Sequence, residues 1–243
     1  MNILVTGASR GIGYNTALSL AAIEGNHVIA VSRDGKGLEL LKKQFASGDS
    51  AGKLSTFAGD IGSDDFLMTL KIMLEKEISS LQILINNAGY LKNAPFAELT
   101  SEDWKQIYDV NVFSPVNVIR TMLPLMKKSE RSESSGFRSH IVNIGSIGGV
   151  QGSSKFSGLS AYSSSKGAMS VLTECLAEEF KSDHIAVNCL ALGSVQTEMF
   201  LQAFPGFTAA KKPGEMGVFI GKFAMEGNLF YNGKVLPVSV STP

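Results

Sequence analysis

The sequence predicts an α/β protein built on a doubly wound, mostly parallel sheet with helices on both faces. Short apolar runs alternate with longer segments of helical periodicity from the first residue onward. Several runs are apolar throughout rather than at every second residue, which is typical of parallel strands covered on both sides. The chain has 243 residues with neither internal repeats nor a long linker, so we expect a single domain over residues 1–243.

Seven apolar runs are the expected strands, and helical segments separate them. Ile12, Thr16, Leu20 and Ile23 follow the first run at the spacing of one helix face. The strands are expected at Asn2–Thr6, His27–Ser32, Lys53–Ala58, Leu81–Asn86, Ser139–Ile144, Ile185–Leu190 and Lys234–Val238.

A long helix is expected from about residue 101 to Met126. Thr100 or Ser101 is a suitable N-cap, because acidic residues follow in the first turn. Pro115 lies inside this segment, so it should kink the helix or require a local adjustment.

Two stretches depart from the alternation of strands and helices. Lys127–Ser139 is rich in Ser, Lys, Arg and Glu and is expected to be an exposed loop. Gly145–Ser160 is rich in Gly and Ser and joins a strand end to a helix. Ligands of open α/β sheets bind beyond the carboxyl ends of the strands, so the second loop is the better candidate for function.

Composition excludes several classes of protein. Lys+Arg and Asp+Glu are 22 each, and this balance argues against a nucleic-acid partner, which a basic excess would favour. No apolar run is long enough to cross a bilayer. The first residues carry no basic stretch, so we expect no cleaved signal and a cytoplasmic protein. Cys175 and Cys189 are too few for a disulfide framework and lack metal-ligand spacing, so no metal is expected.

The first expected strand leads into a glycine-rich turn. The segment Thr6-Gly7-Ala8-Ser9-Arg10-Gly11-Ile12-Gly13 has the spacing G-x-x-x-G-x-G and is followed at once by a helix. Glycines allow a tight turn and close approach of the backbone, and the helix N-terminus offers free N–H groups to a diphosphate. An ordinary turn between strand and helix is the alternative, but the position after the first strand favours dinucleotide binding.

Further motifs follow in a fixed order. Asn86-Asn87-Ala88-Gly89 ends the fourth expected strand, Asn111 lies in the long helix, and Ser146 follows the fifth strand. Tyr162 and Lys166 are four residues apart and therefore share one helix face. Over nearly its whole length, the sequence resembles the short-chain dehydrogenase/reductase family. The resemblance implies a Rossmann-type oxidoreductase that interconverts a small-molecule carbonyl and a secondary alcohol by hydride transfer.

The resemblance also implies a role for each polar residue of this set. Tyr162 would be the general acid and base, and Lys166 would lower the pKa of Tyr162 and hold the nicotinamide ribose. Ser146 would polarise the substrate oxygen, and Asn111 would hold a water that relays protons towards Lys166. Taken alone, each residue also has an ordinary structural interpretation, as a surface group, a turn cap or a helix-kink residue.

NADP(H) is expected as cofactor in preference to NAD(H). Ser32 stands where relatives that use NAD carry an acid, and Arg33 with Arg10 could pair with the 2′-phosphate. The alternative is that Asp34 binds a free ribose hydroxyl. The expected cofactor-binding residues are Gly7, Ser9, Arg10, Gly11, Ile12, Gly13, Arg33, Asp60, Ile61, Asn87, Ala88, Gly89, Tyr162, Lys166, Val195 and Thr197.

A short substrate lid is expected at about residues 197–210. Its Met, Leu and Phe side chains would suit a partly apolar substrate, or they could form a subunit contact. Leu192 replaces a proline common in the family, and the loop between Ser146 and Tyr162 is a few residues longer than usual. The resemblance further implies a homodimer or homotetramer built on the helices containing Trp104–Met126 and Ala161–Phe180.

Two other functions compete with this interpretation. One is a nucleotide-binding sensor or scaffold without turnover, although such proteins usually lack part of the Ser-Tyr-Lys set. The other is a sugar-nucleotide epimerase or dehydratase, which normally has a larger C-terminal region than the one that follows Thr197 here.

Overall fold

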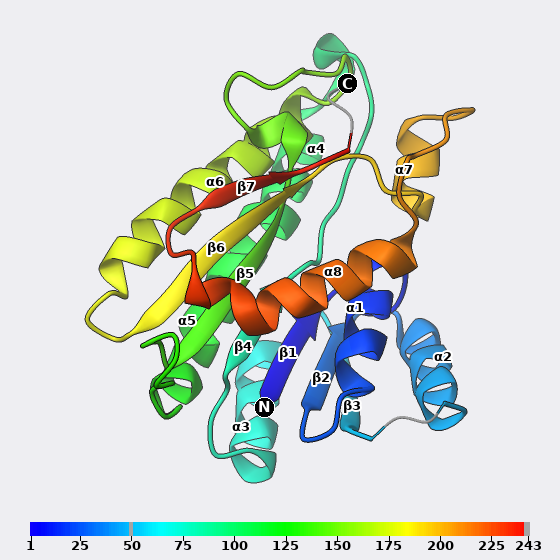
Figure 1. The fold of residues 1–243 in the computed structure, drawn as a ribbon. Coiled ribbons are helices and arrows are strands. Elements are labelled where there is room, and N and C mark those ends of the chain that lie inside the picture. Colours follow the sequence, from blue (N-terminus) through cyan, green and yellow to red (C-terminus); the bar gives the residue numbers. More distant parts are fainter. Residues whose placement is uncertain (49–50, 241–243) are drawn as a thin grey trace.

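A seven-stranded parallel sheet forms the centre of the computed structural model, which describes residues 1–48 and 51–240 (Figure 1). The strands lie in the order β3-β2-β1-β4-β5-β6-β7, and every neighbouring pair is parallel. This confirms the doubly wound sheet expected from the apolar runs. The strands are β1 (Asn2–Thr6), β2 (His27–Ser32), β3 (Lys53–Ala58), β4 (Ile83–Asn86), β5 (Ser139–Ser146), β6 (Ile185–Leu192) and β7 (Val235–Val238).

Helices cover both faces of the sheet (Figure 1). Successive residues of β1 point to opposite faces: Ile3 and Val5 join the core under α1, α2 and α8, and Leu4 joins the core under α3, α5 and α6. The main helices are α1 (Gly11–Ala21), α2 (Gly35–Ala46), α3 (Asp64–Glu77), α4 (Ser101–Tyr108), α5 (Ser114–Lys127), α6 (Ser160–Glu179), α7 (Glu198–Ala203) and α8 (Pro213–Glu226).

The expected long helix consists of α4 and α5 joined by a π-helical segment, Asp109–Phe113. Thr100 caps α4 as expected, and its hydroxyl accepts a hydrogen bond from the Asp103 N–H. The local adjustment expected at Pro115 is this wide turn, in which the Ser114 N–H bonds the Asp109 carbonyl five residues back. Pro115 therefore lies in the first turn of α5, where its missing N–H costs little.

Strand boundaries differ slightly from those expected. β5 and β6 each extend two residues further, so Ser146 is the last residue of β5 rather than the first after it. The order of the strands reverses between β1 and β4, and the loops after these two strands diverge there. Such a crevice is the usual ligand site of an open parallel sheet. The helix α7 stands beyond this edge of the sheet (Figure 1).

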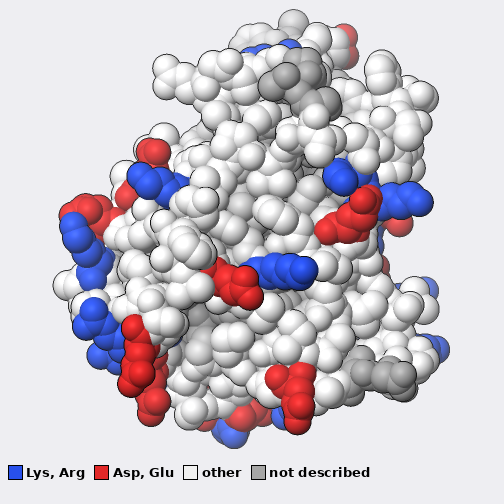
Figure 2. Space-filling model, in the orientation of Figure 1, with Lys and Arg blue, Asp and Glu red and all other residues white. Residues whose placement is uncertain are grey.

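The surface shown in Figure 2 carries no broad area of one charge. Basic and acidic side chains lie beside one another in small groups, mostly towards the margins of this face (Figure 2). This face therefore lacks the extended basic surface that binds nucleic-acid phosphates. Within residues 1–48 and 51–240, no helix is long and apolar enough to cross a membrane.

Candidate active site

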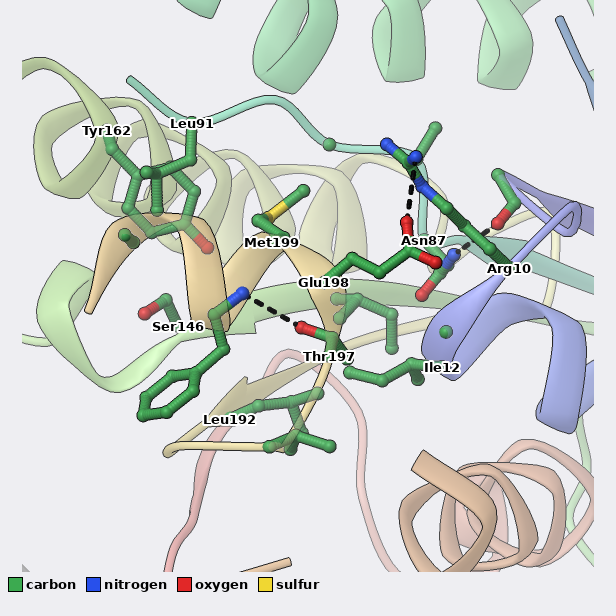
Figure 3. A pocket seen from close by; sticks show the side chains of 18 of the residues that line it. Arg10, Ile12, Asn87, Leu91, Ser146, Tyr162, Leu192, Thr197, Glu198 and Met199 are labelled. Atoms are coloured by element: carbon green, nitrogen blue, oxygen red, sulfur yellow. Dashed lines mark hydrogen bonds and ion pairs between the residues drawn. The ribbon is translucent and has the colours of Figure 1, made fainter. Parts of the chain in front are cut away.

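A cavity of about 1080 Å³ opens at the carboxyl edge of the sheet. One wall is the glycine-rich turn between β1 and α1, and the opposite wall contains Ser146 and Tyr162 (Figure 3). The loop after β4 and the segment after β6 complete it. Segments that lie far apart in the sequence therefore enclose one site.

The glycine turn brings backbone close to backbone. Gly7 has φ +67°, and a Cβ placed on it would lie 2.7 Å from the Ala88 Cα atom, so only glycine suits this position. Gly11 begins α1 with φ +59°. Arg10 at the N-cap makes no side-chain cap, which leaves first-turn N–H groups of α1 available to a bound anion.

Asn87 fastens the loop after β4 to the glycine turn. Its Nδ2 atom donates to the carbonyl oxygens of Thr6 (3.0 Å) and Gly7 (3.1 Å). The Thr6 hydroxyl in turn accepts from the N–H groups of Asn87 and Ala88. These bonds hold both loops in a fixed relation at the switch point of the sheet.

The end of β2 supplies hydroxyl and guanidinium groups. Ser32 Oγ donates to Ser9 Oγ at 2.9 Å, and Arg33 is exposed and lines the cavity. Among the described residues Arg33 has no hydrogen-bond or ion-pair partner, so its donors are free for a ligand. The Asp34 carboxylate instead caps α2 by accepting from the Gly37 N–H at 3.1 Å. This bond occupies one of the two carboxylate oxygens, and Asp34 also lines the cavity.

The Arg10 side chain does not point towards Ser32 and Arg33 at the end of β2. Its Nη1 atom lies 3.0 Å from Glu198 Oε2 at the start of α7 (Figure 3). The Asp60 carboxylate accepts from the Gly62 N–H at 2.9 Å, and Ile61 beside it is buried. Asp60 and Ile61 form the wall of the cavity after β3.

Ser146, Tyr162 and Lys166 meet on the far wall. Ser146 ends β5, while Tyr162 and Lys166 lie on one face of the first turns of α6. Lys166 is buried, and its Nζ atom donates to the Ile144 carbonyl at 2.8 Å. The same nitrogen is 5.8 Å from the centre of the Tyr162 ring.

Burial controls the protonation of this pair. It raises the pKa of Tyr162 to about 12, and a hydrogen bond with Ser146 opposes the rise. Burial also lowers the pKa of Lys166 to about 8. The rise comes from the cost of burying a phenolate, and the lowering by Lys166 that the family resemblance implies stays a prediction. Tyr162 is therefore a protonated phenol near neutral pH, which is the form that can donate a proton.

Asn111 lies directly behind this wall, in the π-helical segment. Its Nδ2 atom donates to the Tyr90 carbonyl and to Ser165 Oγ, both at 2.9 Å, and its Oδ1 atom accepts from the Tyr90 N–H. A Cβ on Gly89 would lie 3.5 Å from Asn111 Oδ1 and 3.6 Å from Lys166 Nζ. Gly89 therefore leaves space between the amide and the ammonium group.

Aromatic side chains enclose the end of the cavity beside Tyr162. Phe204 of the segment after β6 makes an edge contact with Phe156 at 5.6 Å and a tilted contact with Phe200 at 5.2 Å. Asn93 Nδ2 donates to the Ala203 carbonyl at 2.7 Å and so ties this segment to the loop after β4. The apolar lining at this end comprises Leu91, Phe156, Leu159, Met199, Phe200, Phe204 and Phe207.

The cavity contains nearly all the residues expected to form the site. Gly13 and Asn111 do not line it, because both are buried directly behind it. Sequence reasoning missed Leu91, Phe156 and Leu159. Phe156 lies in the lengthened loop between Ser146 and Tyr162. The extra length of this loop was the sequence feature that could have indicated an additional lining residue. Among the described residues no group of His, Cys, Asp or Glu is arranged to hold a metal ion.

Comparison with known proteins identifies similar chains. The family model described as short chain dehydrogenase matches residues 1–206. A rhamnolipids biosynthesis 3-oxoacyl-[acyl-carrier-protein] reductase of Pseudomonas aeruginosa is 29% identical, with 97% of this chain and 93% of that protein covered. Gluconate 5-dehydrogenase of Gluconobacter oxydans is 31% identical, with 97% and 91% covered.

Solved structures show the same fold with a nucleotide bound. A short chain dehydrogenase from Shigella flexneri complexed with NADP superposes with a TM-score of 0.86 at 25% identity, covering 97% of this chain and 95% of that one. The RhlG/NADP active-site complex of Pseudomonas aeruginosa gives 0.84 at 27% identity, covering 98% and 94%.

Proposed function

The chain belongs to the short-chain dehydrogenase family of oxidoreductases, and from this premise we propose that it uses NADP(H) to interconvert an apolar carbonyl compound and the corresponding secondary alcohol. One observation carries the proposal. Ser146, Tyr162 and Lys166 form one wall of a cavity whose other wall is a glycine turn at a helix N-terminus. A candidate proton donor thus lies across one cavity from a turn that suits the diphosphate of a dinucleotide.

The residues of the cradle fit NADP(H). The positive φ angles of Gly7 and Gly11 and the uncapped start of α1 suit a diphosphate held by backbone N–H groups. Arg33 has free donors for the 2′-phosphate, and Asp34 is engaged as a helix cap. The NADP and NADPH complexes of similar structures support this choice.

The nicotinamide of bound NADP(H) supplies hydride for reduction or accepts it for oxidation. Tyr162 donates its phenolic proton to the substrate oxygen in reduction and removes a proton from the alcohol in the reverse direction. With a pKa of about 12, Tyr162 carries its proton near neutral pH and so is in the form that donation requires. Ser146 orients and polarises the same oxygen by donating a hydrogen bond to it.

Lys166 and Asn111 assist proton transfer by Tyr162. The Lys166 ammonium can leave the Ile144 carbonyl to hold ribose hydroxyls and to stabilise a phenolate during turnover. The gap at Gly89 between Asn111 and Lys166 offers room for a bridging water that returns a proton to the pair. Each of these roles is assigned from the contacts of the side chain and from the family resemblance.

The lining beside Tyr162 indicates the character of the substrate. Leu91, Phe156, Phe200 and Phe204 line the cavity with Tyr162. The cations in its described lining are Arg33 after β2, Arg10 paired with Glu198, and Lys166 beside Tyr162. A neutral ketone or aldehyde with an alkyl or aryl group matches this surface better than a sugar acid, whose carboxylate would lack a partner. We propose that residues 197–210 act as the lid over such a substrate.

The remaining proposals concern assembly and location. We propose a cytoplasmic homodimer or homotetramer built on the helical segments 104–126 and 161–180, since Phe113 and Val171 in these segments expose large apolar side chains. The molar mass in solution, measured by light scattering, tests the assembly. The complete Ser-Tyr-Lys set and the oxidoreductase relatives do not favour a sensor or an epimerase.

The activity is tested with two coenzymes and two kinds of carbonyl. Neutral alkyl and aryl ketones are offered with NADPH or NADH, matched sugar acids serve as the polar control, and absorbance at the NADPH band reports turnover. We expect NADPH oxidation with neutral ketones and formation of NADPH from the matched alcohols. Turnover confined to sugar acids would overturn the substrate assignment, and tight NADPH binding without any turnover would overturn the enzymatic one.

A further inference from the structure

An ion pair bridges the glycine turn and the proposed lid. Arg10 Nη1 and Glu198 Oε2 are 3.0 Å apart, although 188 residues separate them in the chain. Arg10 precedes α1 in the cofactor cradle, and Glu198 is the first residue of α7 (Figure 3). The pair therefore connects the part of the cavity assigned to the coenzyme with the part that covers the substrate.

Among the described residues, the lid is attached at a neck and held by polar contacts on two sides, besides the ring contact of Phe204 with Phe156. At the neck, the Gln196 N–H bonds the Lys211 carbonyl at 2.8 Å, and Gln196 Oε1 accepts from the Ala209 N–H. On the substrate side, Asn93 holds the Ala203 carbonyl. On the coenzyme side, the ion pair of Arg10 with Glu198 ties the start of α7. Loss of that ion pair would remove the tie between the start of α7 and the glycine turn, while the Thr197 cap of α7 and the other attachments remain.

Arg10 lines the same cavity as Ser9, Ser32 and Arg33, which face the proposed 2′-phosphate site, although its side chain is turned towards Glu198. Its pair with Glu198 is weak, because each side chain is 64% exposed and water screens the attraction. A phosphate group carries nearly two charges and three strong acceptors, so it bonds a guanidinium more strongly than an exposed carboxylate does. A phosphate held by Arg33 would therefore draw Arg10 away from the lid.

We propose that Glu198 couples the lid to the 2′-phosphate of the coenzyme through Arg10 and thereby reduces the preference for NADP(H). The proposal rests on the proposed NADP(H) site. With NAD(H), Arg10 stays bonded to Glu198 and the first turn of α7 stays tied. With NADP(H), Arg10 moves to the 2′-phosphate, Glu198 is released, and that turn loosens. Glu198 also lowers NADP(H) affinity, because it competes for Arg10 and repels the phosphate.

Two measurements on the intact protein test this coupling. Calorimetry gives the affinities for NADP⁺ and NAD⁺, and hydrogen–deuterium exchange follows the backbone amides of residues 197–204 with each coenzyme at saturation. The variants are Glu198→Gln and the charge exchange R10E/E198R. Glu178→Gln is the matched control, because Glu178 forms an exposed ion pair with Lys181 away from the cavity.

In the unaltered protein, exchange in residues 197–204 should be faster with NADP⁺ than with NAD⁺. Glu198→Gln should show fast exchange with both coenzymes and bind NADP⁺ about two- to fivefold more tightly, with NAD⁺ affinity unchanged. R10E/E198R restores an ion pair but repels the phosphate, so exchange should be slow with both coenzymes and NADP⁺ affinity should fall. Glu178→Gln should match the unaltered protein.

Equal exchange with NADP⁺ and NAD⁺ in the unaltered protein would overturn the coupling and leave the proposed function intact. A Glu198→Gln variant in which both affinities change equally would overturn the coupling in the same way. If the unaltered protein binds neither coenzyme, the proposed function fails and the coupling falls with it.

Discussion

Replacement of Gly13 by alanine should damage both the stability of the fold and the cofactor cradle. A Cβ at this position would lie well under 3.0 Å from the Gly7 carbonyl oxygen and from Asn87 Nδ2. Asn87 would have to leave its bonds to the carbonyl oxygens of Thr6 and Gly7, and the glycine turn would have to move. Overpacking together with two lost hydrogen bonds should lower the free energy of unfolding by about 2 to 6 kcal/mol.

Urea unfolding measures this loss, and calorimetry with NADP⁺ measures the effect on the cradle. Gly35→Ala is the matched control, because Gly35 also begins a helix and its added Cβ would meet only Ala58 Cβ at 3.6 Å. The control should change the free energy of unfolding by less than about 0.5 kcal/mol. If Gly13→Ala is as stable as the control and binds NADP⁺ as the unaltered protein does, close packing does not require glycine in this turn.

Three further predictions concern the coenzyme, the lid and His140, which is buried in the sheet at β5. Arg33→Ala should weaken NADPH binding about tenfold and leave NADH unaffected, and calorimetry showing equal losses would mean that Arg33 does not contact the phosphate. Phe204→Ala should raise KM for neutral ketones about fivefold without changing NADPH affinity, whereas an unchanged KM would place the substrate elsewhere. Burial lowers the pKa of His140 from 6.5 to about 4, so its stabilising contribution is complete above pH 6.5 and is lost as pH falls through 4. The difference is about 3 kcal/mol, and His140→Asn should flatten the pH dependence of unfolding there; an unchanged slope would refute the assignment.

Much of the fold followed from local sequence patterns. The continuous apolar character of residues 28–31 reflects burial on both faces, as expected of parallel strands between two helical layers. The π-helical segment could not be predicted beyond a local adjustment at Pro115. Its form depends on tertiary contacts, notably those of Asn111 with Tyr90 and Ser165.

The site was predicted less evenly than the fold. The glycine turn and the Tyr162–Lys166 pair could be predicted from their spacing, because a tight turn and a helix each fix these positions locally. The upward shift of the Tyr162 pKa could not be predicted from the sequence, because residue spacing shows the nearby charge but not the depth of burial. The pairing of Arg10 with Glu198 was equally hidden, because the two residues meet only after the whole sheet has formed.

The direct test of the central claim is the rate of NADPH-dependent ketone reduction by Tyr162→Phe. Tyr231→Phe is the control, because it removes a phenolic hydroxyl that lies outside the cavity. If Tyr162 donates the proton, its replacement should lower kcat by about 10²- to 10⁴-fold while NADPH affinity stays within twofold, and the control should retain full activity. A kcat within a few-fold of the unaltered enzyme would contradict the assignment of Tyr162 as the proton donor.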